Sequence, residues 1–396
     1  MPDERPAVVV ISPEAPYPLV GGGQHRTACL VEYLARHYAV DLVLFRQPGE
    51  PDPTGTLPPG LARRQVTLDL PRHSKSGLAR AMRNARRVMR GVPPLNDRFS
   101  GFGREVEEFT RGERYAAGII EHFWCAAYWE QLAGVCGRIV LDLHNVESVL
   151  LERLAAVETG PRRWMLRRFA RAAELWERRW LPKFDLLLAA SEGDARRAAE
   201  KAGGARVHVY PNTLPAGPQP EVEEEEAIAF SGNFEYAPNR DGAVWFAREI
   251  WPRLRARRPA LEWRLIGRNA EGLRRPLGLP EGIRFCGAVE DPAGELARCK
   301  VAIVPLRAAS GTRVKILEAW AAGRAVVSTA IGAEGLEARP GEQVALAEDA
   351  EEFASAVLSL LEADEERRRL GQAGRALFER CYTREVGWAA LRAAGL

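Results

Sequence analysis

The sequence has few cysteines, and their spacing does not suit a metal site or a disulfide framework. Six cysteines are scattered over 396 residues, and no two of them form a C-x-x-C pair. Neither a zinc site nor a set of disulfides is therefore indicated. This pattern favours a reducing compartment, and we expect a cytoplasmic protein.

Long apolar runs and a strong net charge are also missing. No uncharged apolar run reaches the roughly 18 to 20 residues that cross a bilayer. The chain begins with MPDERPAVVVIS, in which the short apolar run reads as a strand rather than as a secretory signal. The net charge is only +3, and the arginine-rich stretches lack interleaved aromatic platforms, so nucleic acid is not expected as a partner.

Short apolar runs alternate with amphipathic stretches along the whole chain, which is typical of an α/β fold with parallel sheets. In the first half the expected strands are Val8–Ile11, Val40–Phe45, Gly118–Ile120, Ile139–Leu143, Leu186–Ala189 and Val207–Tyr210. In the second half they are Ile228–Ser231, Leu261–Ile266, Ile283–Cys286, Val301–Pro305 and Ala325–Ser328. The pattern predicts two doubly wound sheets.

A segment rich in Pro, Gly and Glu separates the two halves. The Pro, Gly and acidic residues of TLPAGPQPEVEEEE replace the apolar periodicity there, as in a linker. We expect a Rossmann-like domain at 1–212, a linker at 213–226 and a second Rossmann-like domain at 227–380. The C-terminal helix, about 380–396, is expected to return to the first domain with Trp388.

Three glycines, Gly21, Gly22 and Gly23, follow the first strand and precede a helix. Glycines allow close backbone approach, and N–H groups at a helix start favour a diphosphate. An ordinary strand-to-helix turn is the structural alternative. Neither G-x-x-x-x-G-K-[ST] nor G-x-G-x-x-G is present, which disfavours a P-loop and a dinucleotide fingerprint.

The segment VAIVPLRAASGTRVKILEAWAAGRAVVST reads as strand, loop, helix and strand. We expect Ser310, Gly311 and Thr312 to cap the helix and to present N–H groups to an anion. Arg313 and Lys315 add fixed positive charge beside them.

Glu318 lies within the same helix, between Leu317 and Ala319. A carboxylate is ordinary on an exposed helix face, where it would pair with an arginine, but it needs a partner on a buried face. If Glu318 faces a ligand site, ribose hydroxyls are natural donors to it.

The segment ILEAWAAGRAVVST resembles the C-terminal signature of glycosyltransferase family four, the glycosyl transferases group one. Further similar segments follow the family's order: the early glycine loop, LDLHNVES, LLAASEGDARR, VYPNTLP, FSGNFEYAPN, RLIGRN and RFCGAV. The resemblance implies a GT-B fold, in which two Rossmann-like domains face each other across a cleft.

The resemblance also implies a function. It is transfer of a hexose-type sugar from a nucleotide-diphosphate donor, with UDP or GDP expected, to a glycan, lipid-linked or small-molecule acceptor. Configuration would be retained, and the setting would be bacterial polysaccharide or glycoconjugate biosynthesis. By the same resemblance Glu318 holds the ribose, and Gly22 and Gly23 match the loop that faces the diphosphate. The other donor-binding residues that we expect are Gly232, Asn233, Gly267, Ser310, Gly311 and Thr312.

Two departures from the family pattern concern the donor site. Ser310 stands eight residues before Glu318, where the family places its first glutamate. In FSGNFEYAPNRDG this chain has asparagines where many relatives place an Arg and a Lys on the diphosphate. We expect Arg313 and Lys315 to substitute and to stabilise the departing diphosphate. No D-x-D motif stands where a metal would bind, so we expect neither metal nor cofactor.

His144 follows the expected strand Ile139–Leu143, at the carboxyl edge where ligands bind in open α/β sheets. We expect it to act in catalysis by contacting the transferred sugar or phosphate, with a structural histidine as the alternative. Its neighbour Glu147 is a weaker candidate. His122 ends another strand, but its aromatic neighbours read as core.

Two basic stretches, RHSKSGLARAMRNARRVMRG and RRWMLRRFARAAELWERRWLP, have helical patterns. Solvated faces explain them, but such helices also bind anionic membranes, as in relatives with lipid-linked acceptors. Contact with the inner face of a membrane is therefore an alternative. Two alternatives to a transferase also stay open: a UDP-sugar epimerase of GT-B fold, and a non-catalytic protein that binds nucleotide sugars.

Overall fold

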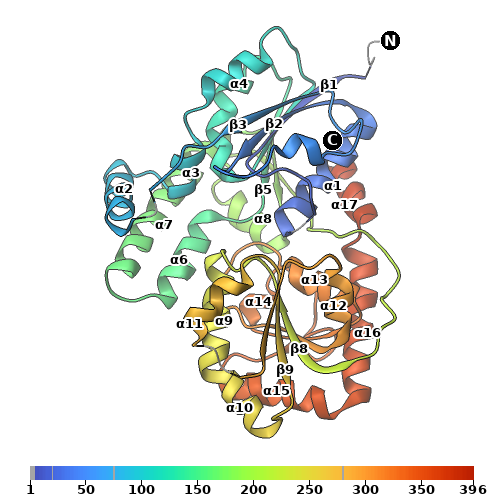
Figure 1. Cartoon of the computed structure of the whole chain (residues 1–396). Helices are drawn as coiled ribbons and strands as arrows, with labels where there is room; N and C mark the ends of the chain where they lie inside the picture. The colour runs from blue at the N-terminus through green and yellow to red at the C-terminus, as the bar shows by residue number, and fades with distance from the viewer. Residues whose placement is uncertain (1–4, 20, 75, 279–280) are drawn as a thin grey trace. The chain divides into compact units, whose positions relative to one another are not determined.

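The computed structural model describes residues 5–19, 21–74, 76–278 and 281–396 (Figure 1). The chain divides into two compact units. The first is built from 23–211 and 387–396 with the described part of 1–19, and the second mainly from Asn212–Val386.

The described residues of the first unit form a seven-stranded sheet in the order β3-β2-β1-β4-β5-β6-β7, and every neighbouring pair is parallel. Its strands are β1 (Ala7–Ser12), β2 (Ala39–Arg46), β3 (Arg64–Asp69), β4 (Ala117–Glu121), β5 (Ile139–Leu143), β6 (Leu186–Ala189) and β7 (Arg206–Val209). The helices are α1 (Gly22–His37), η1 (Pro53–Thr56), α2 (Gly77–Arg90), α3 (Pro94–Phe99), α4 (Gly103–Thr110), η2 (Phe123–Tyr128), α5 (Trp129–Leu132), α6 (Glu147–Val157), α7 (Gly160–Trp180), η3 (Leu181–Lys183) and α8 (Glu192–Ala199).

The described residues of the second unit form a six-stranded sheet in the order β10-β9-β8-β11-β12-β13, again with parallel pairs. Its strands are β8 (Glu225–Ser231), β9 (Glu262–Ile266), β10 (Ile283–Gly287), β11 (Cys299–Val304), β12 (Ala325–Ser328) and β13 (Ala345–Leu346). The helices are α9 (Ala237–Trp245), η4 (Phe246–Ile250), α10 (Trp251–Arg257), η5 (Ala270–Leu273), α11 (Arg274–Leu277), α12 (Pro292–Arg298), α13 (Val314–Ala321), α14 (Ala330–Ala333), α15 (Ala350–Glu362) and α16 (Asp364–Cys381).

The prediction of two doubly wound parallel sheets is confirmed, and each of the eleven expected strands overlaps an observed one. The central strands are covered on both faces, so they read as continuous apolar runs; all five residues of β5, for example, are buried. Two strands were not predicted. In β3 only Leu68 is buried, and β13 has two residues, so neither carries an apolar run.

The last helix, α17 (Arg384–Ala394), carries Trp388 into the core of the first unit. The indole Nε1 of Trp388 donates a hydrogen bond of 3.0 Å to the carbonyl oxygen of Cys29, and the guanidinium of Arg36 lies 3.7 Å from the ring centroid. At the end of the chain, the Tyr33 hydroxyl donates to the carbonyl of Leu396. The C-terminal ten residues are thus part of the first unit.

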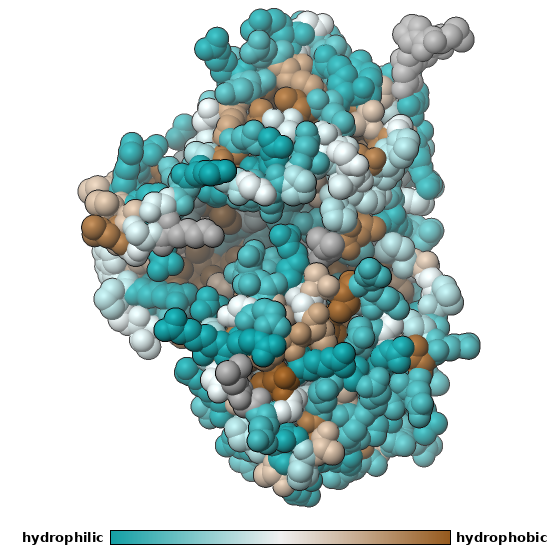
Figure 2. Space-filling model, viewed as in Figure 1, coloured by the Kyte–Doolittle hydropathy of each residue, from teal (hydrophilic) through white to brown (hydrophobic). Residues whose placement is uncertain are grey.

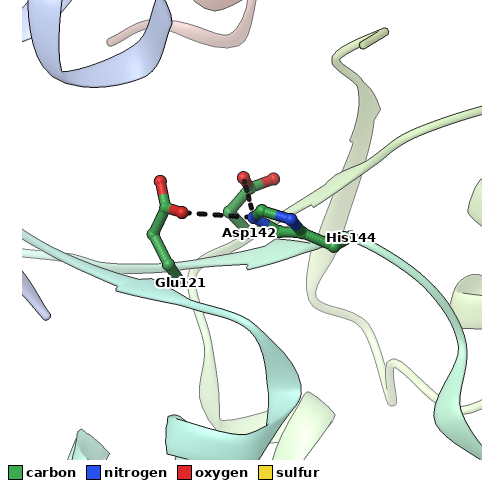
Figure 3. Close-up of side chains that lie close together, drawn as sticks. All are labelled: Glu121, Asp142 and His144. Carbon is green, nitrogen blue, oxygen red and sulfur yellow. Dashed lines mark hydrogen bonds and ion pairs between the residues drawn. The ribbon is translucent and has the colours of Figure 1, made fainter. Parts of the chain in front are cut away.

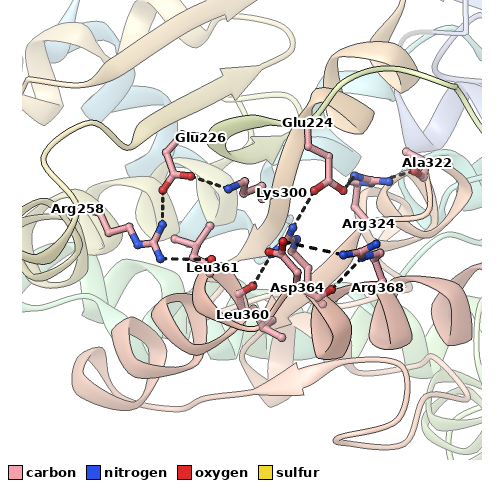
Figure 4. A network of polar contacts seen from close by, with 11 residues as sticks. Glu224, Glu226, Arg258, Lys300, Ala322, Arg324, Leu360, Leu361, Asp364 and Arg368 are labelled. Atoms are coloured by element: carbon pink, nitrogen blue, oxygen red, sulfur yellow. Dashed lines mark hydrogen bonds and ion pairs between the residues drawn. The ribbon is translucent and has the colours of Figure 1, made fainter.

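The acidic run before the second sheet is bound to that unit (Figure 4). Strand β8 begins at Glu225, inside the range expected for the linker. The carboxylates pair with basic side chains: Glu224 with Arg324 and Arg367, and Glu226 with Arg258 and Lys300. These ion pairs give the acidic residues a structural role at the entry to the second sheet.

Candidate functional site

A buried polar cluster lies at the carboxyl ends of β4 and β5 in the first unit (Figure 3). Glu121 and Asp142 occupy neighbouring positions on the two strands, and His144 follows β5. The Nε2 atom of His144 lies 3.1 Å from Oε2 of Glu121 and 3.4 Å from Oδ2 of Asp142. Both carboxylates therefore interact with one imidazole nitrogen.

Arg26, on α1, supplies the compensating positive charge. Its Nε and Nη2 bind both oxygens of Asp142, at 2.8 and 2.5 Å, and its Nη1 donates to the carbonyl oxygen of Tyr210 at 2.6 Å. Thr27, the next residue on α1, donates its hydroxyl to Glu121. A bidentate pair of this kind fixes the orientation of the carboxylate as well as its charge.

These contacts set the protonation of the two stacked histidines. Burial alone would lower the pKa of His144, but the hydrogen bonds and charges of Asp142 and Glu121 outweigh it and raise the pKa to about 9. His122 stacks on His144 with ring centroids 3.5 Å apart. Burial, together with the charges of His144 and Arg26, holds the pKa of His122 well below its usual value. The pair therefore consists of an imidazolium and a neutral imidazole at neutral pH.

The ligand atoms of Glu121, Asp142 and His144 all lie within 4.8 Å of one another, a spacing that would also suit a cation. However, Arg26 already binds both oxygens of Asp142, and the imidazolium uses Nε2 toward both carboxylates. The cluster is thus internally neutralised. Because Nε2 is used in this way, Nδ1 is the second N–H donor of the imidazolium.

Glu147 is a further buried carboxyl group close to this cluster. It opens α6, is 5% exposed and accepts a hydrogen bond of 2.7 Å from the indole Nε1 of Trp124. Burial raises its pKa to about 7, against the opposing effect of the Trp124 hydrogen bond. Trp124 in turn stacks on His122 at 4.2 Å, so Glu147 and His144 flank one aromatic stack.

Gly22 and Gly23 lie in the first turn of α1, because that helix begins at Gly22 rather than after Gly23, and Gly21 precedes it. A Cβ atom on Gly23 would lie 2.7 Å from a carboxylate oxygen of Glu14 and 4.0 Å from Nε2 of His122. The lack of a side chain at Gly23 therefore lets the start of α1 approach the histidine stack.

In the second unit, two glycines bring the ends of β8 and β9 into contact. Gly232 and Gly267 have φ angles of 145° and 126°, and a Cβ atom on Gly267 would lie 2.2 Å from the carbonyl oxygen of Gly232. Only glycine fits such an approach. The same Gly232 lies against Lys315, since a Cβ atom there would be 3.2 Å from the lysine Nζ.

Lys315 and Glu318 project from α13 toward this glycine turn. Lys315 Nζ donates to Oδ1 of Asn239 at 2.9 Å, and Glu318 Oε2 accepts a hydrogen bond of 2.9 Å from the Ser231 hydroxyl. Burial lowers the pKa of Lys315 to about 8, although the charge of Glu318 opposes this effect, and burial raises the pKa of Glu318. The turn, one ammonium group and one carboxylate are thus brought together.

The remaining predicted donor residues have structural contacts. Asn233 Oδ1 accepts from the Glu235 N–H at 2.9 Å, and its carbonyl accepts from Asn239 Nδ2 at 2.8 Å. Arg313 is 5% exposed, and its guanidinium donates to the carbonyl oxygens of Ser310 and Gly311 and, at 3.1 Å, to that of Ile331. Arg313 thus binds its own loop.

The predicted cap of α13 is wrong. The helix begins at Val314 and its N-cap is Arg313, with no side-chain cap hydrogen bond. Ser310, Gly311 and Thr312 lie in the loop before it, where Gly311 has a φ angle of 76° and the Thr312 carbonyl accepts from Asn212 Nδ2 at 3.2 Å.

Comparison with known proteins finds a family model that matches part of the second unit. Residues 225–363 match the family model of glycosyl transferases group 1. A protein of Klebsiella pneumoniae, described as an uncharacterized 44.6 kDa protein in the cps region, is 25% identical over 141 residues. That match spans 33% of this chain and 36% of the curated relative.

Solved structures share the fold of the whole chain. Sucrose-phosphate synthase from Thermosynechococcus elongatus superposes with a TM-score of 0.75 at 19% identity, over 98% of each chain. Anabaena HepE, in complex with UDP and glucose, gives 0.66 at 13% identity over 98% of this chain and 99% of HepE. An E. coli structure described as trehalose-6-phosphate bound with UDP-2-fluoro glucose gives 0.62 at 14% identity over 98% of each chain.

Proposed function

We propose that this GT-B protein, whose residues 225–363 match the family model of glycosyl transferases group 1, transfers a hexose-type sugar from a nucleotide-diphosphate donor with retention of configuration. The observation that carries the proposal is the arrangement of Lys315, Glu318 and the Gly232 turn in the second unit. HepE and the E. coli protein, which are similar in fold, were crystallised with UDP or a UDP-sugar. UDP is therefore the first nucleoside diphosphate to test, and GDP is the second.

Each group has a role that its chemistry suits. The carboxylate of Glu318 accepts hydrogen bonds from the ribose hydroxyls, exchanging its Ser231 contact or adding to it. Gly232 lets the diphosphate approach the backbone, and the ammonium of Lys315 stabilises the charge that grows on the departing diphosphate. Arg313 supports this site by holding the loop before α13.

In the first unit, His144 donates an N–H hydrogen bond to a hydroxyl or phosphate oxygen of the donor. Glu121 and Asp142 keep its ring charged and oriented, and Arg26 keeps Asp142 in place. We propose that transfer needs no metal ion, because Lys315 and backbone N–H groups supply the positive charge that a divalent cation would bring. Activity that disappears in EDTA and returns with magnesium would contradict this part.

The transfer itself is tested by release of the nucleoside diphosphate. UDP-sugars and GDP-sugars are incubated with the protein in EDTA, with and without a pool of bacterial glycans and lipids as acceptor. Acceptor-dependent release is expected with one base, and it is expected to be abolished in Lys315→Met but kept in Lys300→Met, whose ammonium pairs with Glu226. No release with any sugar would contradict the proposal.

Two rival functions give different outcomes in the same assay. A GT-B epimerase would convert the sugar of a UDP-sugar without an acceptor, and product analysis would find an isomerised sugar. A non-catalytic protein would bind the nucleotide sugar without turnover. The departure at Ser310 favours neither, because Lys315 and Glu318 are both present at the donor site. The Klebsiella relative, named for a cps region, favours polysaccharide or glycoconjugate biosynthesis.

We also propose that the first unit binds the surface of an anionic membrane. Three apolar residues of α2 are unusually exposed, Leu78 at 73%, Met82 at 59% and Met89 at 81%, and Figure 2 shows hydrophobic side chains at the place of α2. They share one helix face, because their spacings are four and seven residues. None of the helices among the described residues has the length and apolar composition needed to cross a bilayer, so binding would be peripheral.

Vesicle flotation tests this surface. We expect the protein to float with vesicles that contain phosphatidylglycerol and to float less with pure phosphatidylcholine, because arginines border the apolar face. The triple change Leu78→Ser, Met82→Ser, Met89→Ser should remove flotation, and Leu346→Ser, an exposed leucine of the second unit, should not. Equal flotation of both variants would refute the surface.

A further inference from the structure

The opposite face of α2 borders a cavity lined by arginines. The cavity has a volume of about 480 Å³ and lies between α2, α3 and the segment before α2, all in the first unit. Its lining residues are His73, Ser74, Arg80, Arg83, Asn84, Arg87, Pro94, Leu95 and Arg98. The four α2 residues recur at helical spacing, so one face of the helix turns basic side chains toward the cavity.

Helix α2 exposes apolar and basic side chains together and buries one arginine. Leu78, Met82 and Met89 are exposed, as are Arg80, Arg86 and Arg90, whereas Arg87 is buried. Burying a guanidinium is costly unless the site offers a compensating charge. The cavity therefore needs an anion, either from the protein or from a ligand.

The protein supplies only part of that charge. Asp97, on α3, accepts from Arg87 at 2.8 Å and from Arg90 at 3.2 Å, so its one carboxylate is shared by two guanidinium groups. Within the described parts of the chain, Arg83 and Arg98 have no carboxylate partner. Arg83 donates to the carbonyl oxygen of Ser74 at 3.0 Å.

Arg98 lies at the wall of the cavity and has only neutral partners of its own. It donates to Oε1 of Gln47, and its Nη1 lies 3.1 Å from Nδ1 of His73. Burial and the nearby charges of Arg87 and Arg83 lower the pKa of Arg98. Burial and the same arginines, with Arg98 itself, lower the pKa of His73, so that ring stays neutral and accepts the hydrogen bond. The cavity thus concentrates uncompensated positive charge in a partly dehydrated space.

The cavity is connected to the histidine pair through packed rings. Phe99, next to Arg98 on α3, stacks on Trp124 at 5.6 Å, Trp124 stacks on His122, and His122 stacks on His144. Asn96 Nδ2 also donates to the carbonyl oxygen of Phe123 at 3.1 Å. Helix α3 is therefore fixed against the segment that follows β4.

We propose that the α2–α3 cavity binds a phosphate group of the acceptor. A phosphate dianion matches several guanidinium groups, whose planar forks bind its oxygens in pairs. The assignment of the phosphate to the acceptor rests on the proposed transferase function, but the anion site itself does not depend on it. The phosphate could be carried by a lipid headgroup or by a soluble phosphorylated sugar, and both sources present the same group to the arginines.

Protection of arginines from phenylglyoxal, mapped by mass spectrometry on the wild-type protein, tests the site directly. At inorganic phosphate ten times above its Kd, about one site in eleven stays free, so the labelling of Arg83 and Arg98 should slow about tenfold. Labelling of Arg86, which does not line the cavity, should not change. Equal labelling of Arg83 and Arg98 with and without phosphate, or equal protection by sodium chloride at the same ionic strength, would overturn the proposal.

A second arm of the experiment separates the two phosphate sources. Protection by vesicles of phosphatidylcholine with phosphatidic acid, at a phosphate concentration where free phosphate gives none, would assign the group to a lipid. Protection by free phosphate alone would assign it to a soluble acceptor. Either result supports the site.

Catalysis tests the link to the acceptor. The double variant Arg83→Gln, Arg98→Gln should lower acceptor-dependent diphosphate release about tenfold or more, as loss of a charged hydrogen bond does, with unchanged affinity for the donor. The matched double variant Arg104→Gln, Arg111→Gln removes two exposed charges of the same unit, away from α2, and should behave as wild type. Equal release by both would overturn the acceptor assignment. Absence of donor binding in wild type would instead overturn the transferase function and leave the protection result standing.

Discussion

His144 should stay positively charged well above neutral pH. With a pKa of about 9, His144 is about 97% protonated at pH 7.5, whereas a histidine at its ordinary value of 6.5 would be about 9% protonated. The cause is the pair of carboxylates on Nε2, since burial by itself acts in the opposite direction. The charge is therefore a direct consequence of Glu121 and Asp142.

The same interaction contributes to stability in a defined pH range. Because the pKa in the folded state lies above the unfolded value of 6.5, the contribution is complete below pH 6.5 and is lost as the pH rises through about 9. The two pKa values differ by about 2.5, which corresponds to about 3 kcal/mol. The pKa values of Lys315 and Glu147, about 8 and about 7, fall in the same pH range. Only the difference in stability between wild type and a His144→Gln variant therefore isolates this effect.

The assay is a pH titration of labelled histidine by nuclear magnetic resonance. The chain has six histidines, and the His144→Gln variant assigns the signal. Glu121→Gln should lower the pKa of His144 by roughly one or more, because a neighbouring carboxylate typically has that effect. Glu130→Gln, an exposed carboxylate of the same unit, should leave it unchanged. A wild-type pKa at or below 6.5, or no response to Glu121→Gln, would refute the reasoning.

Three further results are expected in the second unit. Calorimetry should show that the affinity for a nucleoside diphosphate falls roughly tenfold per pH unit above about 8, where Lys315 loses its proton. The Lys315→Met variant should lose this pH dependence. An unchanged pH dependence in the variant would exclude Lys315 as its cause. Glu318→Gln should weaken the same nucleotide roughly tenfold while sparing inorganic pyrophosphate, and equal losses for both would argue against a ribose contact. Gly267→Ala should destabilise the unit by about 2 kcal/mol or more in urea, because its Cβ would collide with the carbonyl of Gly232, whereas Gly278→Ala, with open space around it, should cost less.

Most strands and their division between two sheets could be predicted from the sequence because buried parallel strands leave continuous apolar runs. The run at Ile139–Leu143 gives both ends of β5, whereas β3 has no such run because most of its residues are partly exposed. Short polar strands at sheet edges depend on neighbours that only the folded chain provides.

Residues of the candidate site could be predicted only where their place relative to a strand or a helix in the sequence indicates a role. His144 and Glu318 were found from their places after a strand and within a patterned helix. Arg26 and Glu121 were missed, because their pairing with Asp142 and His144 joins segments far apart in sequence. A carboxylate at the end of each neighbouring strand was the available signal.

Arg313 shows a different limit of the sequence. Its charge and place before α13 suggested a diphosphate ligand, but in the structure its guanidinium donates to carbonyl oxygens of its own loop and to that of Ile331 on α14. Side-chain direction depends on the backbone turn at Gly311, which residue types alone do not give.

A thermal-shift comparison of UDP, GDP, ADP and TDP in EDTA, on wild type and Lys315→Met, tests the central claim most directly. A ligand at one hundred times its Kd stabilises the native state by about 2.7 kcal/mol. We predict that one diphosphate raises the Tm of wild type without metal and that the increase is lost in Lys315→Met. No increase with any of the four, or an equal increase in the variant, would contradict a donor site built on Lys315 and Glu318.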